Sequence, residues 1–397
     1  MKYKKISKIK KLIILFCIMC LSLVIGFLGG YFYQTKKTNY RTLYAKNISD
    51  WPKPLVDEGI EYEEMRPLDS LPPIPDDNPF TQEKRLLGEF LFEEPLLSKS
   101  AQIACSSCHN KELGFGDGLK TSFGHDRQRG NRNAPSIYVS GFYKQLFWDG
   151  RANTLEEQAM GPIENPIEMA CNVSLALQHI KDSLFYQNLF LLAFGESLIT
   201  LEKKSLLGKA FVSVDDFEKL KNTKISQNLQ EIMTTTNLLK AIATYERSLT
   251  PTNSRFNRFL NGDDKALSDQ EIYGLHLFRT KGKCMNCHYG MILSDSKFHN
   301  IGLSFYGRKL EDLGRYEITK DEKDKGAFKT PSLISISKTA PYMHNGIFPH
   351  LRGVLNMYNI AFGKDENKQF LEISPLIHKL GLDEEELQAL ESFLKTL

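Results

Sequence analysis

The sequence predicts a mostly α-helical fold with two related domains in tandem, preceded by an N-terminal transmembrane anchor. Three observations predict it. A Cys-x-x-Cys-His motif occurs twice, at Cys105–His109 and Cys284–His288; each copy follows a segment with helical apolar spacing; and no sustained period-2 alternation indicates strands. The length of 397 residues suffices for two domains with sizeable cores.

Each motif has the groups that attach a haem covalently. Two cysteines supply thiols for the vinyl groups, and the adjacent histidine supplies an imidazole for the iron. A zinc site would not need that histidine, and a thioredoxin-type motif would lie in a βαβ unit, which this sequence lacks. We therefore expect two covalently bound haem c groups: Cys105 and Cys108 attach the first, with His109 as iron ligand, and Cys284 and Cys287 attach the second, with His288 as iron ligand.

The charge balance argues against nucleic acid as a partner. The chain has 51 basic and 48 acidic residues, but six lysines lie within the first eleven positions, so the remainder has 45 against 48, or −3. Of the other cysteines, Cys17 and Cys20 lie in an apolar N-terminal run and Cys171 stands alone. No disulfide framework is indicated, and we expect Cys171 to be a small buried side chain.

The N-terminus has the pattern of a membrane anchor. The uncharged segment 12–33 is 22 residues long, which is enough to span a bilayer. More lysine before this segment than after it places the N-terminus in the cytoplasm and exports the rest of the chain. We expect a signal anchor over residues 1–33; a cleaved signal peptide is the alternative, because Gly29 and Gly30 are small residues near its end.

Composition and capping patterns divide the remainder. Residues 34–80 contain seven of the sixteen prolines, which predicts an extended tether. The first haem domain is expected over residues 81–250 and the second over 251–397, with no role indicated for the polar stretch 196–236.

Helix starts are marked by side chains that cap backbone N–H groups. Thr81 is a candidate N-cap before the first motif, and Ser268 with Glu271 forms a capping box before the second. Asp383 with Glu386 begins a closing amphipathic helix. Residues 237–260 are expected to form one helix between the domains, with an apolar face made of Leu238, Ile242, Tyr245 and Leu249.

The two domains repeat one another beyond the motifs. Positions 196 residues apart carry the same residues: Pro135-Ser136 and Pro331-Ser332, Gly150 and Gly346, Leu155 and Leu351. The motifs themselves are only 179 residues apart, so the second domain has 17 additional residues between His288 and Pro331. The pattern indicates one haem-binding unit that was duplicated and then diverged.

Four further motifs give the chain a resemblance to a known family. They are RNAPS at 132–136, FWDGRA at 147–152, EQAMGPIENPIEM at 157–169 and TAPYMHNG at 339–346. Together they resemble the bacterial dihaem cytochrome c peroxidases, a family that includes the methylamine-utilisation protein MauG, from about Pro72 to the C-terminus. The resemblance implies hydrogen peroxide reduction at the first haem and electron entry at the second. It also implies a small cytochrome c or cupredoxin as donor, the periplasmic face of the bacterial inner membrane as location, and a homodimer as a common state.

The resemblance assigns roles around the first haem. His125 matches a histidine that caps the iron and leaves on activation, and Gly124 and Gly130 would permit that movement. A loop histidine without this role is the alternative. Glu168 matches the distal acid that moves a proton between the two peroxide oxygens, with Glu164 as a nearby competitor.

Two further side chains complete this part of the resemblance. Gln158 would orient the peroxide beside Glu168. Trp148 matches a residue between the haems that could carry electrons, although most tryptophans are only packed.

The second haem is where the chain departs from the ordinary peroxidases. They have a methionine ligand twelve residues after the glycine of the APYxHxG motif, and the same count from Gly346 reaches Tyr358, as in MauG. A phenolate is a harder ligand than a thioether and favours ferric or higher states, so a lower potential follows. Met357 is the alternative ligand, and the remaining candidates are His299, His344 and His350.

A calcium ion between the domains is also implied. In the family it is bound by an asparagine side chain and main-chain carbonyls, which Asn133, Thr339 and Pro341 match here. The sequence thus predicts a dihaem peroxidase. The rivals are a MauG-like enzyme that oxidises a partner protein and a non-catalytic electron carrier, and Glu168 argues against the second of these because a carrier has no use for a distal acid.

Overall fold

The computed structural model describes residues 39–195, 213–225, 228–361 and 371–397. The chain divides into two units, Met1–Ala45 and Lys46–Leu397. Of the first unit, the described part contains the short helix α2 (Arg41–Tyr44). The predicted anchor, residues 1–33, lies outside the described residues. Within the described residues, none of the helices combines the length and the apolar character that crossing a membrane requires.

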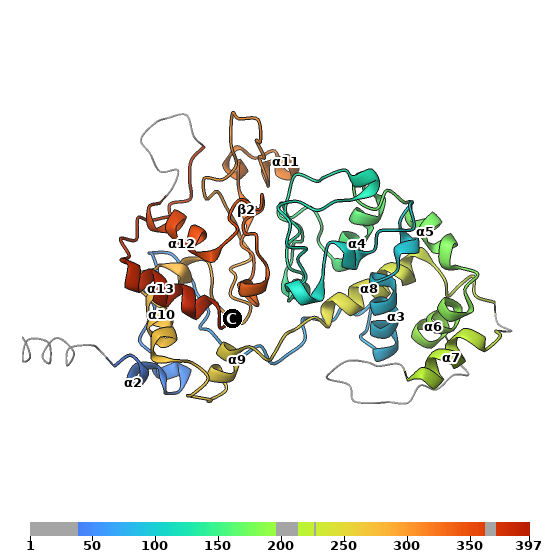
Figure 1. Cartoon of the computed structure of the whole chain (residues 1–397), viewed down its shortest axis with the longest axis horizontal. Coiled ribbons are helices and arrows are strands. Elements are labelled where there is room, and N and C mark those ends of the chain that lie inside the picture. The colour runs from blue at the N-terminus through green and yellow to red at the C-terminus, as the bar shows by residue number, and fades with distance from the viewer. Residues whose placement is uncertain (1–38, 196–212, 226–227, 362–370) are drawn as a thin grey trace, which may run out of the picture. The chain divides into compact units, whose positions relative to one another are not determined.

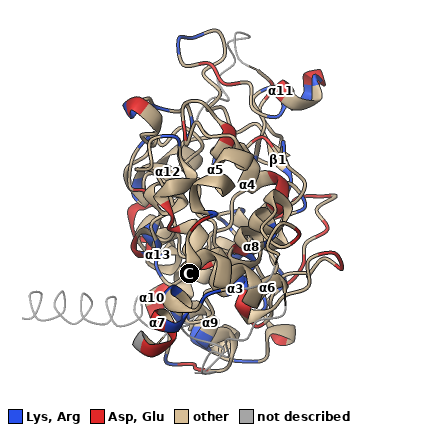
Figure 2. Cartoon of the chain, turned by 90° about the vertical axis from the view of Figure 1, so that its right-hand side faces the viewer, with Lys and Arg blue, Asp and Glu red and all other residues tan. Residues whose placement is uncertain are grey.

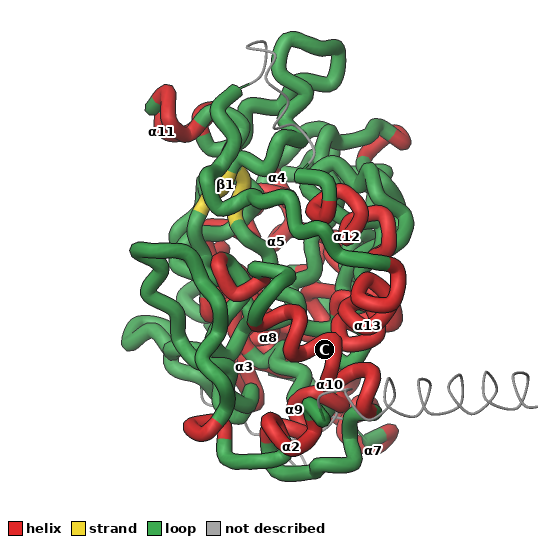
Figure 3. The backbone as a smooth tube through the Cα atoms, turned by 90° about the vertical axis from the view of Figure 1, so that its left-hand side faces the viewer, coloured by secondary structure: helices red, strands yellow, loops and turns green. Residues whose placement is uncertain are grey.

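In the described part of the second unit, the regular structure is helical apart from one pair of two-residue strands (Figures 1 and 3). The first half, residues 81–250, contains α3 (Gln82–Phe92), α4 (Leu155–Glu164), α5 (Val173–Ile180), α6 (Leu184–Phe194), α7 (Val214–Asn222) and α8 (Thr235–Arg247). The second half, residues 251–397, contains α9 (Arg255–Leu260), α10 (Asp269–Arg279), α11 (Tyr316–Thr319), α12 (Leu351–Asn359) and α13 (Glu384–Leu394). Strands β1 (Phe298–His299) and β2 (Phe328–Lys329) pair antiparallel, with Phe298 opposite Lys329. The predicted helical fold class is confirmed, although long loops connect the helices.

The predicted helix starts are confirmed. The Thr81 side chain accepts a hydrogen bond from the Lys84 N–H at the start of α3. Capping boxes begin α10, at Ser268 with Glu271, and α13, at Asp383 with Glu386.

The single helix predicted for residues 237–260 is wrong. Helix α8 ends at Arg247 and α9 starts at Arg255. Pro251 explains the break, because a proline lacks an N–H donor and disfavours helical geometry at the residue before it. Leu249 therefore lies outside α8, where its carbonyl accepts a hydrogen bond from the Val139 N–H.

Each half is built on two helices that cross at a glycine. In the first half α3 packs against α8, and a Cβ added at Gly88 would lie 2.0 Å from the Ala241 carbonyl oxygen. In the second half α10 packs against α13, and a Cβ at Gly274 would lie 2.1 Å from the Ala389 carbonyl oxygen. In Figure 1, α10 and α13 lie at the left and α3 and α8 at the right. The duplicated unit therefore has the same backbone contact in both copies.

Separate apolar cores surround these crossings. The first is formed mainly by α3, α5, α6 and α8, with Leu87, Ile180 and Phe190 fully buried, and it includes Cys171, which is buried as predicted. In the second half, the Phe393 ring makes edge contacts with Phe256 and Phe278 at centroid distances of 5.1 and 5.4 Å.

Residues 51–80 contain no helix or strand, as their proline content predicts, but they pack against both halves. Arg279, fully buried on α10, forms an ion pair with Glu64, and the Leu68 N–H donates to Asn257 Oδ1 at 2.7 Å. Asn78 Nδ2 donates to Glu156 Oε1 at 2.8 Å in the first half. This segment is therefore part of the folded body instead of a solvated tether.

The surface charges agree with the near-neutral balance of the sequence. Basic residues (Lys and Arg) and acidic residues (Asp and Glu) are both spread over the ribbon in Figure 2. Many of them pair locally, as Lys320 does with Glu317 at 3.1 Å.

The helix crossing gives a stability prediction. Gly88→Ala places a methyl group 2.0 Å from the Ala241 carbonyl oxygen. We expect the free energy of unfolding to fall by about 1–3 kcal/mol, the usual cost of overpacking. Denaturant unfolding measures it, with Gly130→Ala as control because no atom lies within 4 Å of a Cβ added there. Equal stability of the two variants would contradict the crossing.

Candidate active site

Both Cys-x-x-Cys-His motifs border one large cavity. Its volume is about 430 Å³, and its walls include all four motif cysteines, His109 and His288. Apolar side chains from both halves make up much of the remaining wall, among them Phe92, Ile103, Ile137, Leu155, Leu351, Leu355 and Leu390. A cavity with this lining is suited to flat apolar groups.

The two motifs have the same local geometry. Cys105 and Cys284 each begin a short 3-10 helix, Cys105–Ser107 and Cys284–Asn286. The N–H of the histidine donates to the first cysteine's carbonyl, at 3.0 Å for His109 and 2.8 Å for His288. None of the four motif cysteines forms a disulfide within the described part of the chain. Burial raises the pKa of the thiols of Cys105 and Cys284 to about 12. The thiols are therefore neutral and available for attachment of a haem.

Each imidazole is held by one ring nitrogen. His109 Nδ1 lies 3.0 Å from the Phe115 carbonyl oxygen, and His288 Nδ1 lies 2.9 Å from that of Leu293. Because a carbonyl only accepts, Nδ1 carries the proton in both rings and Nε2 keeps a free lone pair. Burial lowers the pKa of both imidazoles, which favours the neutral form that binds metals. The two sites therefore fit a covalent haem with an axial histidine.

A serine braces the loop behind each imidazole. Ser136 Oγ donates to the Gly114 carbonyl and Ser332 Oγ to the Ile292 carbonyl, both at 2.6 Å. Each of these carbonyls directly precedes the residue that accepts from the histidine. Both accepting residues have positive φ, 61° for Phe115 and 52° for Leu293, which a non-glycine residue adopts only when it is held there. The Pro-Ser repeat in the sequence was the signal for these supporting residues, although their role was not predicted.

Glu168 lies on the wall of the cavity near the first motif. Its Oε1 accepts a hydrogen bond from Asn165 Nδ2 at 2.7 Å. Burial raises the pKa of the Glu168 carboxyl, and Arg151 partly opposes the shift. Gln158, on α4, lines the same cavity, whereas Glu164 is exposed and does not. Of the two carboxylates proposed as distal acid, Glu168 is therefore the one that faces the cavity.

The His125 loop is fixed to the backbone of Glu168. The His125 N–H donates to the Glu168 carbonyl at 2.7 Å. A Cβ added at Gly124 would lie 2.0 Å from the Ile167 carbonyl oxygen, so this glycine permits a close backbone approach. Gly124 lines the cavity but His125 does not. His125 Nδ1 is buried, and no described residue forms a hydrogen bond with it. The predicted ligand role of His125 stays a prediction.

The halves meet through a reciprocal pair of backbone hydrogen bonds. The Asn133 N–H donates to the His344 carbonyl at 2.7 Å, and the Lys329 N–H donates to the Trp148 carbonyl at 2.8 Å. Lys329 and His344 stand 196 residues beyond Asn133 and Trp148, so the repeat relates one bond to the other. Trp148 Nε1 also donates to the Asn133 carbonyl at 2.9 Å, and the indole lies edge-on to the His344 ring at 6.3 Å. Trp148 is therefore held rigidly between the halves.

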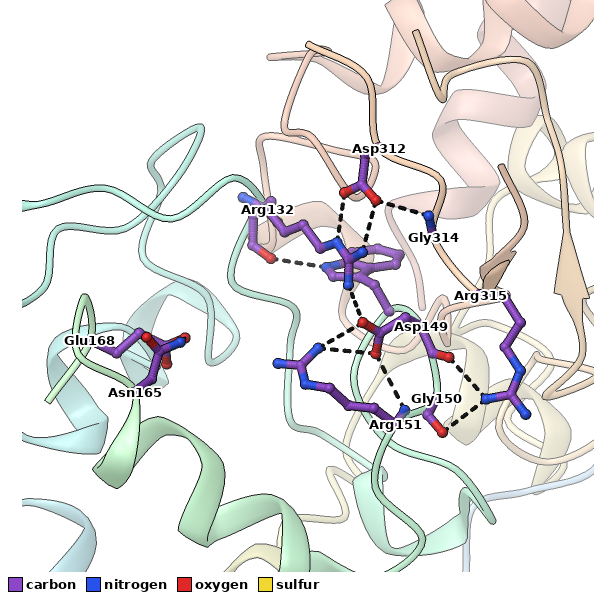
Figure 4. A network of polar contacts seen from close by, with 11 residues as sticks. Arg132, Asp149, Gly150, Arg151, Asn165, Glu168, Asp312, Gly314 and Arg315 are labelled. Carbon is purple, nitrogen blue, oxygen red and sulfur yellow. Dashed lines mark hydrogen bonds and ion pairs between the residues drawn. The ribbon is translucent and has the colours of Figure 1, made fainter. Parts of the chain in front are cut away.

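An ion-pair network surrounds Asp149, the residue after Trp148 (Figure 4). Arg132 binds Asp312 through two nitrogens, at 2.7 and 2.8 Å, and also pairs with Asp149. Arg151 pairs with Asp149 at 2.9 Å, and Arg315 donates to the Asp149 carbonyl at 2.9 Å. Asp312 and Arg315 belong to the segment that contains the 17 additional residues. This segment therefore joins the second half to the first.

The candidate ligands of the second haem differ in position. Tyr358, on α12, lines the cavity, and burial raises the pKa of its hydroxyl, with Cys287 and Cys284 adding to the shift. Met357 is buried but does not line the cavity, and His350 is exposed outside it.

Two other histidines border the cavity but have other contacts. His299 Nε2 lies 2.7 Å from Asp295 Oδ2. His344 stacks on the Phe328 ring at 3.5 Å, and burial lowers the pKa of its imidazole to about 3.

Asn133, Thr339 and Pro341 all line the cavity. Asn133 is buried, and its Nδ2 donates to the Leu119 carbonyl at 2.8 Å. Among the described residues, the carbonyl oxygens of Thr339 and Pro341 accept no hydrogen bond. These oxygens are therefore free for the cation that the sequence predicts.

Comparison with known proteins identifies the family. A family model for di-haem cytochrome c peroxidases matches residues 82–265. The cytochrome c551 peroxidase of Nitrosomonas europaea is 33% identical over 315 residues, covering 79% of this chain and 83% of that protein. This chain belongs to the di-haem cytochrome c peroxidase family.

Members of this family with the MauG name are also similar. The methylamine utilization protein MauG of Methylorubrum extorquens is 32% identical over 327 residues, covering 82% of this chain and 81% of that protein. The crystal structure of a MauG-like protein associated with microbial copper homeostasis has a TM-score of 0.69 at 29% identity, covering 83% of this chain and 93% of that chain.

One further carboxylate of this peroxidase-family chain was not predicted. Glu246 lies on α8, is only 5% exposed and lines the cavity. Its Oε2 has no hydrogen-bond partner among the residues that the structure describes, and burial raises the pKa of the carboxyl to about 8, partly opposed by Arg247. Helix periodicity could have placed it, because Ile242 and Tyr245 on the same helix are buried. A glutamate next to an arginine is nevertheless usually interpreted from sequence alone as solvent-exposed.

Glu246 gives a pH prediction. Its pKa of about 8 exceeds the ordinary value of 4.5, so ionisation favours the unfolded chain. The free energy of unfolding does not change below pH 4.5 and falls progressively as the pH rises to about 8. Each unit of pKa difference corresponds to about 1.4 kcal/mol, so the total loss is a few kcal/mol. Glu246→Gln should remove this dependence and raise Tm at pH 8 more than at pH 5. Glu164→Gln, at an exposed site, is the control; parallel pH profiles for Glu246→Gln and wild type would contradict the assignment.

Proposed function

We propose that this protein is a dihaem c peroxidase that reduces hydrogen peroxide to two molecules of water, with two protons and with two electrons from a small redox protein. The observation that carries the proposal is the position of Glu168. Its carboxyl lies in the cavity that Cys105 and His109 border, and burial raises its pKa. A peroxidase needs such a group and an electron carrier does not.

The residues present suit two covalent haems. Cys105 and Cys108 would hold the first, with His109 on its iron, and the second motif would do the same through Cys284, Cys287 and His288. When bound, the first haem supplies an iron that binds peroxide and passes electrons to it.

The distal side chains handle the protons. Glu168 takes a proton from one peroxide oxygen and returns it to the other, which becomes water. Gln158 orients the peroxide, and the Asn165 hydrogen bond fixes the carboxyl that acts. Trp148, held between the halves, would carry electrons from the second haem to the first.

Tyr358 supports a second candidate function. Its hydroxyl lines the cavity beside the second motif, and a phenolate ligand there would lower the potential of that haem. Such a haem is better suited to holding part of an oxidising equivalent, at ferric level or above, than to storing one electron at ferrous level. A MauG-like oxidation of a partner protein follows as the alternative, in which the electrons come from that protein.

The remaining predictions complete the proposal. Calcium would bind at Asn133 and at the carbonyls of Thr339 and Pro341, because oxygen ligands suit this ion. The donor would be a cytochrome c or cupredoxin. The chain would be exported and held at the periplasmic face of the inner membrane by residues 1–33.

Glu168→Gln tests the peroxidase. We expect peroxide turnover with reduced cytochrome c to fall by about 10²-fold or more, the usual contribution of a general acid–base. Glu164→Gln should leave turnover near wild type, because that carboxyl is exposed outside the cavity. Wild-type turnover in Glu168→Gln would contradict the role, and no turnover in any variant would favour the carrier. Slow turnover with cytochrome c but rapid reaction with a partner protein would favour the MauG-like alternative.

Tyr358→Phe tests the ligand of the second haem. The variant removes one oxygen, so the optical spectrum of one haem should change, and its midpoint potential should rise. Met357→Leu is the matched control and should change neither. An unchanged spectrum in Tyr358→Phe would exclude the tyrosine.

Removal of calcium tests the cation site. A chelator should alter both haem spectra and lower peroxide turnover, because the ion would join loops from the two halves. Addition of calcium should restore both. Full activity and unchanged spectra after treatment would exclude a structural calcium ion.

A further inference from the structure

Lys329 carries a positive charge at the boundary between the halves. It lies on β2, and its Nζ is 3.3 Å from the centroid of the Tyr143 ring, which belongs to the first half. Both side chains line the cavity. Because the Lys329 N–H also donates to the Trp148 carbonyl, the backbone that carries this lysine is fixed.

This lysine has no negative partner among the described residues. The other basic residues on the cavity wall do: Arg132 and Arg151 pair with Asp149, and Lys283 pairs with Asp57. Burial lowers the pKa of the Lys329 ammonium to about 7. Lys329 is half-buried. A cation withdrawn from water without an anion beside it is costly, and a polypeptide keeps one mainly where an anion will meet it.

Two hydroxyl groups of the first half lie on the same cavity wall. Ser140 Oγ is buried without a hydrogen-bond partner in the described part of the chain. The Tyr143 hydroxyl is buried as well, beside Ser294 and the backbone of Ser332. Both residues line the cavity, in one turn. The ammonium and the hydroxyl of the adjacent Tyr143 are both donors of the kind that bind a carboxylate.

The cavity itself indicates which carboxylate this is. Its two Cys-x-x-Cys-His motifs call for two haems, and each haem brings two carboxylates that cannot be left unpaired inside the protein. We propose that Lys329 binds a carboxylate of a haem at the boundary between the halves, with the Tyr143 hydroxyl as a second donor. The position corresponding to Lys329 in the first half is Asn133, so this charge belongs to one half alone.

The proposal has a consequence for redox chemistry. A cation beside a haem carboxylate offsets its negative charge and stabilises the reduced iron, which carries less positive charge. Lys329 therefore raises the midpoint potential of the haem that it binds. The backbone of Lys329 is bonded to that of Trp148. The higher midpoint potential would therefore apply at the place where electrons would pass between the halves.

The experiment compares Lys329→Gln with Lys329→Arg in the full chain with both haems attached. Redox titration and resonance Raman spectra, recorded without peroxide, are the two measurements. We expect Lys329→Gln to lower the midpoint potential of one haem and to shift its carboxylate bending band, and Lys329→Arg to change both much less. Lys320→Gln, an exposed lysine of the same half, should match wild type.

Tyr143→Phe gives a second reading that does not depend on the lysine variant folding. It should shift the same band in the same direction by a smaller amount. Unchanged bands and potentials for both haems in Tyr143→Phe and in folded Lys329→Gln would overturn the proposal. A changed iron spin state with an unchanged carboxylate band would assign Lys329 to the iron and overturn it too. Because no step uses peroxide, these results stand apart from the peroxidase test.

Discussion

The hydrogen bond between each motif imidazole and a backbone carbonyl is the constraint on which the site depends. His109 and His288 each use Nδ1 for this bond, at 3.0 and 2.9 Å. A ring free to rotate could present either nitrogen, but a ring fixed in this way presents only Nε2 to an iron. The serine brace behind each carbonyl, present in both halves, shows that the duplication preserved the support as well as the ligand.

The boundary between the halves has diverged more than the haem motifs. The repeat pairs Trp148 with His344 and Asn133 with Lys329, so equivalent backbone bonds now carry different side chains. The additional residues of the second half add Asp312, which anchors Arg132 beside this contact. The backbone contacts of the boundary are the same in both halves, whereas the charged and aromatic side chains differ. Two haems beside such a boundary would have different surroundings, as chemistry with two unlike haems requires.

The sequence predicts local features well and long-range ones poorly. Capping boxes specified where α10 and α13 begin, because the pairing residues are three positions apart. The break after α8 followed from Pro251 and was missed because the apolar spacing continues through it. The packing of residues 46–80 could not be predicted, since the pairing of Glu64 with Arg279 joins positions far apart in the chain. Glu246 and Lys329 are charged residues on a cavity wall, and no local pattern distinguishes them from solvated ones.

The central claim is that two haems are held covalently and that the first can open a face beside Glu168 while the second is closed by its own ligand. Titration of cyanide into protein of measured haem content, in the oxidised and the half-reduced state, tests it most directly. The account predicts two covalent haems per chain and cyanide binding to one of them, with the spectrum of the other unchanged. Fewer than two covalent haems, or no cyanide binding in either state, would contradict it.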